Sequence, residues 1–109
     1  MKNYEIRITP DAIDDLTALR DYIVGVLGAP MTAQAYLKKL RAAIAALSTM
    51  PDRYQLVEDE PWQSRGIRRM LIKNSFIYYR VDESAKKVYI LNVIYGRRNQ
   101  LVALAEKWR

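Results

Sequence analysis

Hydrophobic residues recur along this chain with two different spacings, which separate extended parts from helical parts. Residues 4–9 alternate apolar and polar side chains, and this pattern predicts a short strand with one buried face. Thr9 and Pro10 then mark a helix start, because a threonine hydroxyl can cap free backbone N–H groups and proline suits the first helical position. Apolar residues at every third or fourth position predict a helix that ends at Gly28, with the stripe Ala12, Leu16, Leu19, Ile23 and Val26.

A second helical pattern follows within a few residues. It begins within Pro30–Thr32 and runs to about Met50, and Pro51 ends it. Two amphipathic helices joined by so short a connection form an antiparallel hairpin, and their apolar stripes need another element to cover them. The stripe of the second helix consists of Ala33, Leu37, Leu40, Ile44 and Leu47.

Residues 64–98 contain three runs rich in β-branched and aromatic residues. The runs Ile67–Lys73, Phe76–Asp82 and Val88–Tyr95 are separated by short polar breaks, which predicts three antiparallel strands. Alternate residues of a strand face opposite sides of a sheet. In the middle run we therefore expect one buried face, formed by Ile77, Tyr79 and Val81, and one outward face that carries Tyr78 and Arg80.

These elements predict an α+β fold. It has an N-terminal strand, an antiparallel helix hairpin packed on one face of an antiparallel sheet, and a short C-terminal helical segment beyond Gly96. A chain of 109 residues can bury roughly 65% of the surface that its unfolded form exposes, so residues 1–109 are expected to form one domain. Trp62 is expected to pack its loop onto this domain. The expected core includes Leu16, Ile23, Leu40, Ile44, Tyr79 and Val81.

Charged residues are unevenly distributed along the chain. The net charge of +6 favours a polyanion or an acidic protein as partner. Residues 61–81 contain five basic side chains and no acid, directly after the acidic stretch Glu58-Asp59-Glu60. Segregation of this kind indicates a working surface, because a surface that serves only solubility mixes its signs. The five basic residues are Arg65, Arg68, Arg69, Lys73 and Arg80.

The chain contains no cysteine and no histidine. Disulfides, thiolate metal sites, the usual zinc sites and Ser-His or Cys-His catalysis are therefore excluded. The scattered acidic residues form no metal-binding pattern and no glycine-rich phosphate loop occurs, so neither a metal nor a cofactor is expected. The first residues lack the apolar core of a signal peptide, and no apolar run approaches the roughly 20 residues of a membrane span, so we expect a cytoplasmic protein.

Two arginine pairs are the strongest candidates for chemistry. Arg68-Arg69 lies on the first predicted strand of the basic region, and Arg97-Arg98 follows the last. Arginine binds phosphate with two hydrogen bonds and can stabilise charge that develops on it. Aromatic and arginine side chains side by side, as in Tyr78 and Arg80, suit stacking on bases. Alternatively, the arginine pairs are ordinary solvated charges at the edge of the sheet, without a role in phosphate binding.

The order of elements and several short motifs resemble the RelE/ParE superfamily of bacterial toxins from type II toxin–antitoxin modules. The likeness covers nearly the whole chain. It is carried by the following segments: Ile8-Thr9-Pro10-Asp11-Ala12 with Asp15-Leu16, Met50-Pro51-Asp52-Arg53-Tyr54, Glu60-Pro61-Trp62, Arg65-Gly66-Ile67-Arg68, Tyr78-Tyr79-Arg80-Val81-Asp82 and Tyr95-Gly96-Arg97-Arg98.

The long helix hairpin and the Gly-x-Arg and Tyr-Arg-Val motifs look more like ParE, whose members poison DNA gyrase. This resemblance implies a plasmid-stabilisation type of toxin that arrests growth by binding its target, and a small acidic antitoxin that wraps and neutralises it. The residues expected to bind the target or nucleic acid are Arg65, Arg68, Lys73, Tyr78, Arg80 and Arg97.

RelE-like members, which cut messenger RNA in the ribosome, are the alternative. On that pattern Arg69 and Arg98 would contact the phosphate and stabilise its charge, and Tyr95 would stand in for a C-terminal acid–base residue, so an enzyme of this kind would be a metal-independent mRNA interferase. A nucleic-acid-binding module without toxicity would explain the charge and the outward aromatic residues equally well. A scaffold role is a third alternative, which a large flat apolar patch would favour.

Overall fold

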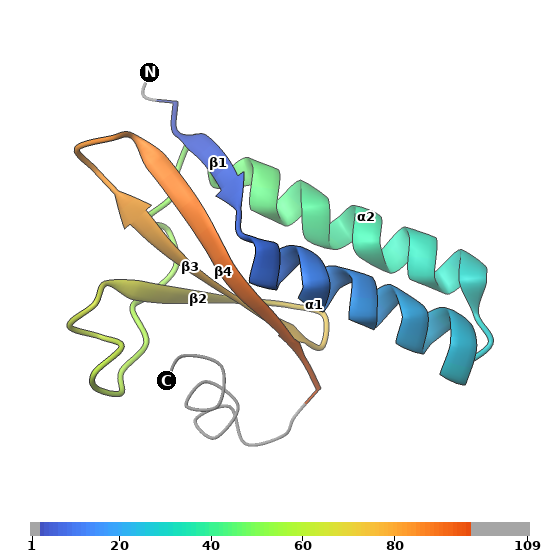
Figure 1. Ribbon diagram of the computed structural model, residues 1–109. Helices are drawn as coiled ribbons and strands as arrows, with labels where there is room; N and C mark the ends of the chain where they lie inside the picture. Colours follow the sequence, from blue (N-terminus) through green and yellow to red (C-terminus); the bar gives the residue numbers. More distant parts are fainter. Residues whose placement is uncertain (1–2, 97–109) are drawn as a thin grey trace.

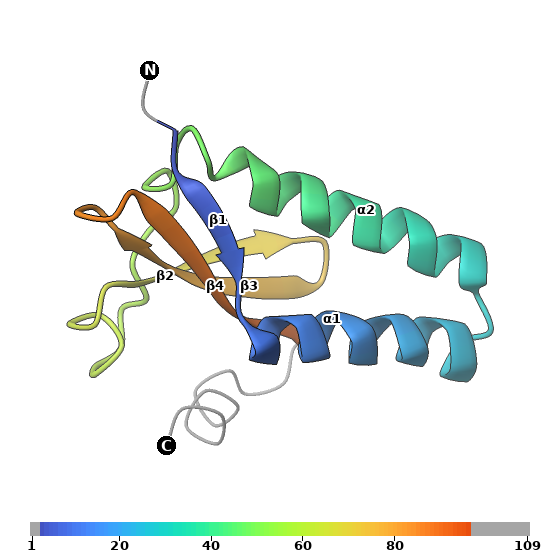
Figure 2. The same ribbon diagram turned by 45° about the horizontal axis from the view of Figure 1, so that its top comes forward.

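The computed structural model describes residues 3–96 and has the expected α+β architecture. Figures 1 and 2 show two antiparallel helices on one face of a sheet, with the tip of the helix hairpin projecting beyond it. The predicted C-terminal helical segment lies outside the described residues. In chain order the elements are β1 (Glu5–Ile8), α1 (Pro10–Asp21), the π-helical segment η1 (Tyr22–Val26), α2 (Pro30–Ala46), β2 (Ile67–Ile72), β3 (Ser75–Asp82) and β4 (Lys87–Tyr95).

The four strands lie in the order β1-β4-β3-β2. β2, β3 and β4 form the antiparallel unit that their short connections predicted. β1 joins the sheet beside β4 and runs parallel to it, so the sheet as a whole is mixed. No tight turn constrains the direction of β1, because the whole helix hairpin lies between it and the other strands.

The start of α1 follows the expected capping pattern. The Thr9 hydroxyl accepts a hydrogen bond from the backbone N–H of Ala12 at 3.3 Å, and Pro10 occupies the first helical turn. The same hydroxyl donates to the carbonyl oxygen of Ile90 in β4 at 2.7 Å. One side chain therefore begins the helix and also fixes it to the sheet.

The apolar stripe of the first helix ends one turn earlier than expected. Ile23 is buried, but Val26 is 70% exposed. Between them the helix widens into η1, in which the backbone N–H of Leu27 bonds the carbonyl of Tyr22 five residues before it. A wider turn holds more residues, so the positions after Ile23 rotate away from the sheet.

α2 ends at Ala46 and not near Met50 as expected. The backbone N–H of Leu47 bonds the carbonyl of Ile44, which tightens the last turn, and the Thr49 hydroxyl donates to the Ala46 carbonyl. Serine and threonine hydroxyls compete in this way with continued helical bonding. The predicted stripe of α2 is nevertheless buried throughout.

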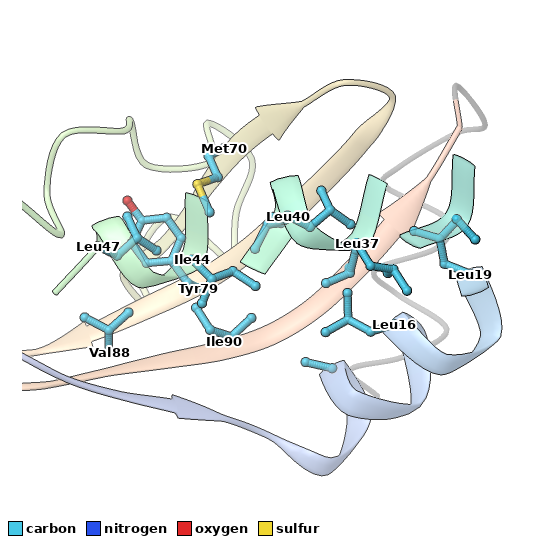
Figure 3. Close-up of a cluster of buried hydrophobic side chains, with 14 of the residues drawn as sticks. Leu16, Leu19, Leu37, Leu40, Ile44, Leu47, Met70, Tyr79, Val88 and Ile90 are labelled. Atoms are coloured by element: carbon cyan, nitrogen blue, oxygen red, sulfur yellow. The ribbon is translucent and has the colours of Figure 1, made fainter. Parts of the chain in front are cut away.

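The main core lies between the helix hairpin and the sheet. Figure 3 shows helix side chains such as Leu40 and Ile44 meeting strand side chains such as Tyr79 and Ile90. The expected core residues are buried, except that Val81 is only partly buried against the cluster. Tyr79 also satisfies its hydroxyl inside this core, since it donates to the carbonyl of Pro51 at 2.6 Å.

A second, smaller core covers part of the opposite face of the sheet (the helix-free face), on which residues 3–96 place no helix. The loop between α2 and β2 folds over this face and buries Trp62 there, as expected. Tyr78 lies beneath it with 0% of its surface exposed, so the prediction that Tyr78 faces outward was wrong. The alternation was correct, but a distant loop covers the face that alternation left open. The cluster consists of Val57, Trp62, Ile67, Tyr78 and Ile94.

Candidate functional site

The register of the strands assigns each candidate side chain to one face of the sheet, because directly opposed residues share a face. Arg69 lies opposite Tyr78 and so belongs to the helix-free face. Arg68 lies opposite Tyr79, whose side chain points into the main core. The two adjacent arginines therefore point to opposite sides, as the strand geometry predicted.

Two arginine–aromatic pairs lie on the helix-free face. The guanidinium of Arg69 lies 4.8 Å from the ring centroid of Phe76, and that of Arg80 lies 5.1 Å from the ring centroid of Tyr89. Attraction to the aromatic face is worth about 0.5–1 kcal/mol at exposed sites, so each ring helps to hold its arginine in place. Arg69 is exposed and Arg80 partly exposed, which leaves both groups accessible to a ligand.

Tyr78 supports this surface from below. Burial raises the pKa of its phenol, while the hydrogen bond and positive charge of Arg69 act in the opposite direction. The phenol therefore stays neutral at neutral pH beside the guanidinium. Tyr78 was predicted as a contact residue, but its buried ring packs under the loop that carries Trp62.

Arg68 has partners within its own chain. Its Nη1 donates to the backbone carbonyl of Tyr54 at 2.6 Å and to that of Asp52 at 3.5 Å. The guanidinium is thus used to hold the loop after α2 against β2. The remaining predicted contact residues lie apart: Arg65 is exposed in that loop, and Lys73 is exposed at the turn between β2 and β3.

Tyr95 lies opposite Ser75 and packs against the helices. Its ring centroid is 6.0 Å from that of Tyr22 and 6.1 Å from that of Tyr36. Arg69 and Tyr95, which the ribonuclease hypothesis assigns to one phosphate, are therefore on opposite faces of the sheet. Arg97 and Arg98 lie outside the described residues.

A groove between α1 and α2 was not predicted from the sequence. Its larger part encloses about 490 Å³, and a smaller hollow of about 130 Å³ shares Arg20, Leu37 and Arg41 with it. Val24 lines the larger part and Ile13 the smaller, and their side chains are 41% and 51% exposed. These two apolar residues lie outside the buried stripe of the first helix, which was the available sequence signal. The groove combines an apolar lining with basic side chains.

The described residues contain neither a metal-binding cluster nor a membrane-spanning helix. Across residues 3–96, no group of three or more acidic, histidine or cysteine side chains is placed to hold a metal ion. Nor does the described part of the chain contain a helix that is long and apolar enough to cross a membrane.

Solved structures with a similar fold include toxins and toxin–antitoxin complexes. A chromosomal ParDE toxin–antitoxin system from P. aeruginosa matches with a TM-score of 0.70 and 22% identity, over 86% of this chain and 97% of the other. The RelBE2 complex of Mycobacterium tuberculosis matches with a TM-score of 0.59 and 23% identity, over 85% and 98%. A mutant of the E. coli toxin RelE in the free state matches with a TM-score of 0.64 and 11% identity, over 96% of each chain. At these identities the likeness establishes the fold.

Sequence comparison identifies the family. No curated protein matches the chain at a significant level. The family model described as the ParE toxin of the type II toxin–antitoxin system parDE matches residues 6–100, which include every described helix and strand except the first residue of β1. The chain therefore belongs to the ParE toxin family of type II toxin–antitoxin systems, within the RelE/ParE superfamily.

Proposed function

We propose that this toxin arrests growth by binding an essential cytoplasmic target, with DNA gyrase preferred, and that it performs no chemistry on that target. Membership of the ParE family supports gyrase over the ribosome. The observation that carries the proposal is the separation of Arg69 and Tyr95 by the sheet.

Cleavage of RNA without a metal has three requirements. A 2′-hydroxyl must lose a proton, the leaving oxygen must gain one, and the phosphate must be stabilised. Arg69 can stabilise a phosphate, but arginine keeps its proton and the chain has no histidine. Tyr95, the candidate for a proton role, packs among the tyrosines of the helix face. A phosphate held by Arg69 would be out of reach of its hydroxyl, which supports action by binding.

The helix-free face supplies the proposed contact with the target. Arg69 and Arg80 are accessible cations on it, each held by an aromatic ring. We further propose Arg65 and Arg97 as contacts, and we assign Tyr78 and Arg68 the task of supporting this surface from within. A guanidinium that is exposed yet held in place loses little conformational freedom on binding, which favours affinity.

The first test compares two outcomes for the purified toxin. Supercoiling by gyrase should stop while ribosome-bound message stays intact. Arg69→Ala should weaken gyrase inhibition about tenfold or more, because an arginine that acts as an interface hot spot contributes about 2 kcal/mol or more. The matched control is Arg53→Ala, which removes an exposed arginine of the loop after α2 and should change inhibition little. Message cut at defined codons while supercoiling continues would establish the ribonuclease, and Tyr95→Phe and Arg98→Ala would then identify its residues.

We also propose that a small acidic antitoxin neutralises the toxin by docking in the groove between α1 and α2. Several structurally similar proteins are complexes of a toxin with its antitoxin. The groove offers an apolar lining and the basic side chains of Arg20 and Arg41, which suits an acidic amphipathic segment that folds on binding.

The antitoxin site can be tested with two valines of η1. Val24 lines the groove, whereas Val26 is more exposed and does not line it. Val24→Lys should weaken capture of the toxin by the product of the neighbouring gene about tenfold or more, because it places a charge in an apolar contact. The Val26→Lys variant should be captured by this product as strongly as the parent is. Equal effects of the two changes would contradict this site.

A further inference from the structure

A separate groove lies where α2 passes the turn between β2 and β3. It encloses about 480 Å³, a size typical of ligand sites. Apart from Lys38, none of its lining residues belongs to the proposed antitoxin groove. Its lining combines three lysines with small and aromatic side chains, namely Thr32, Ala35, Tyr36, Lys38, Lys39, Ala42 and Lys73.

Among the described residues, no acidic side chain pairs with the lysines of this groove. Within residues 3–96, neither Lys38, Lys39 nor Lys73 forms an ion pair. No acidic residue occurs anywhere between Asp21 and Asp52, so α2 carries bases alone. Three uncompensated ammonium groups around one hollow favour an occupant with negative charge.

The floor of the groove is apolar. Ala35 and Ala42 lie seven residues apart on one face of α2, and the ring of Tyr36 lies beside them. Small side chains at this spacing let another helix approach α2 closely. A nucleic-acid backbone has no apolar surface to place on such a floor, whereas an amphipathic helix does. Charge and floor together fit an acidic helix with its apolar side toward α2 and its carboxylates toward the lysines.

The groove is held in place by contacts across the fold. The hydroxyl of Tyr36 hydrogen-bonds the hydroxyl of Ser75 at 2.8 Å and accepts from the backbone N–H of Asn74 at 3.2 Å. Lys73 has a φ of 57°, a backbone conformation that residues other than glycine adopt infrequently. The turn therefore presents Lys73 from a defined backbone position, and the backbone needs little further ordering on binding.

The position of the groove indicates which partner fills it. The β2–β3 turn that carries Lys73 also ends the strand pair that carries Arg69 and the 56% exposed Leu71 on the helix-free face. A partner bound to that face reaches the groove by passing around this turn. We propose that the groove docks an acidic amphipathic helix of the protein target, as a second contact beside the helix-free face; this rests on the proposed function, in which the toxin acts by binding.

The test uses two changes in the groove and one outside it. Lys39→Glu reverses a charge of α2, and Lys73→Gly removes a side chain while suiting the positive φ. Arg53→Glu changes the net charge as much as Lys39→Glu does, but Arg53 is exposed in the loop after α2, where it donates to the Met50 carbonyl, and it lines neither groove. Growth arrest on induction, inhibition of purified gyrase, binding to free DNA or RNA and capture by the product of the neighbouring gene are measured for each. Thermal unfolding checks each fold, and Lys39→Gln replaces Lys39→Glu if the latter unfolds.

The two groove variants should inhibit gyrase at least tenfold less and arrest growth weakly, while the antitoxin captures them as it captures the parent. Arg53→Glu should behave as the parent. Full growth arrest by the groove variants would overturn the proposal. Loss of antitoxin capture would also overturn it, because the groove would then belong to the antitoxin. If the groove variants lost only their binding to free DNA or RNA, the groove would belong to nucleic acid, and the proposal would again be wrong. A harmless parent would instead refute the proposed function itself.

Discussion

Tyr78 and Tyr79 show how two adjacent residues of one type acquire different roles. Both are fully buried, on opposite faces of β3. Tyr79 lies in the main core, where its hydroxyl donates to the Pro51 carbonyl at 2.6 Å. Burial raises the pKa of Tyr79 to about 12, with the positive charge of Arg68 acting against this rise. A hydroxyl in this position stabilises the fold only while it keeps its proton.

The Tyr79→Phe variant should therefore change stability in a pH-dependent way. At neutral pH it should lose about 0.5–1.5 kcal/mol, the contribution of one hydrogen bond. The parent keeps its advantage below pH 10, where the phenol is protonated in both states. Between pH 10 and 12 the unfolded chain loses this proton first, so the parent should lose roughly 2–3 kcal/mol that the variant does not. Urea unfolding of both proteins across this range measures the difference, and a constant gap would contradict the assignment.

At the scale of elements, the junction of β1 and α1 decides how the helix hairpin meets the sheet. β1 pairs with β4 only as far as Ile90. Beyond that point α1 takes over as the neighbour of β4, because the Asp15 carboxylate accepts from the backbone N–H of Val93 at 2.8 Å and from the Asn92 side chain at 3.2 Å. Thr9 joins the two regions through its bond to Ile90. Side chains of the first helix thus satisfy backbone groups that a strand would otherwise pair.

Thr9→Val tests this junction while conserving shape. The change removes the helix cap and the donor to Ile90, so we expect a loss of about 1–2 kcal/mol in the free energy of unfolding. Thr9→Ser keeps the hydroxyl and serves as the control, with a much smaller loss. Chemical denaturation of the three proteins gives the comparison. Equal losses for valine and serine would mean that the methyl group contributes as much as the hydroxyl, which would contradict the assigned role of the hydroxyl bonds.

At the scale of the whole molecule, three candidate binding surfaces with different chemistry lie around the two helices and the sheet. The groove between α1 and α2 is the proposed antitoxin site, and the helix-free face of the sheet is the proposed target site. The groove beside the β2–β3 turn, which Lys38, Lys39 and Lys73 line, lies on the far side of α2. Lys38 lines both this groove and the proposed antitoxin groove. An acidic segment in one groove would therefore reduce the positive charge available to the other.

The net charge of +6 predicts how association depends on salt. Attraction between a basic toxin and an acidic antitoxin speeds their encounter, and dissolved ions screen it. The association rate constant should fall about tenfold or more between roughly 50 and 500 mM salt, while the dissociation rate constant changes less. Stopped-flow mixing at several salt concentrations provides the measurement. An association rate that does not depend on salt would show that apolar contacts alone govern the encounter.

Features that depend on local backbone geometry could be predicted from the sequence. The period of apolar residues reflects the turn of a helix or the pleat of a strand, so it located both helices, the three antiparallel strands and the Thr9 cap. Charge segregation likewise directed attention to Arg69 and Arg80. The local widening at η1 was missed because Ile23 and Val26 fit the apolar spacing of an ordinary α-helix, and that spacing does not reveal a wider turn.

Features that depend on contacts between distant segments required the folded chain. Burial of Tyr78 comes from a loop that crosses the face of the sheet, and strand alternation carries no information about such a cover. The parallel direction of β1 and the groove between the helices also come from packing between separate elements. The separation of Arg69 from Tyr95 follows from the register of three strands, including the irregularity beside Tyr78 and Tyr79. Because each shift of one residue reverses the face of a side chain, long-range pairing alone determines which candidate residues can meet at one ligand.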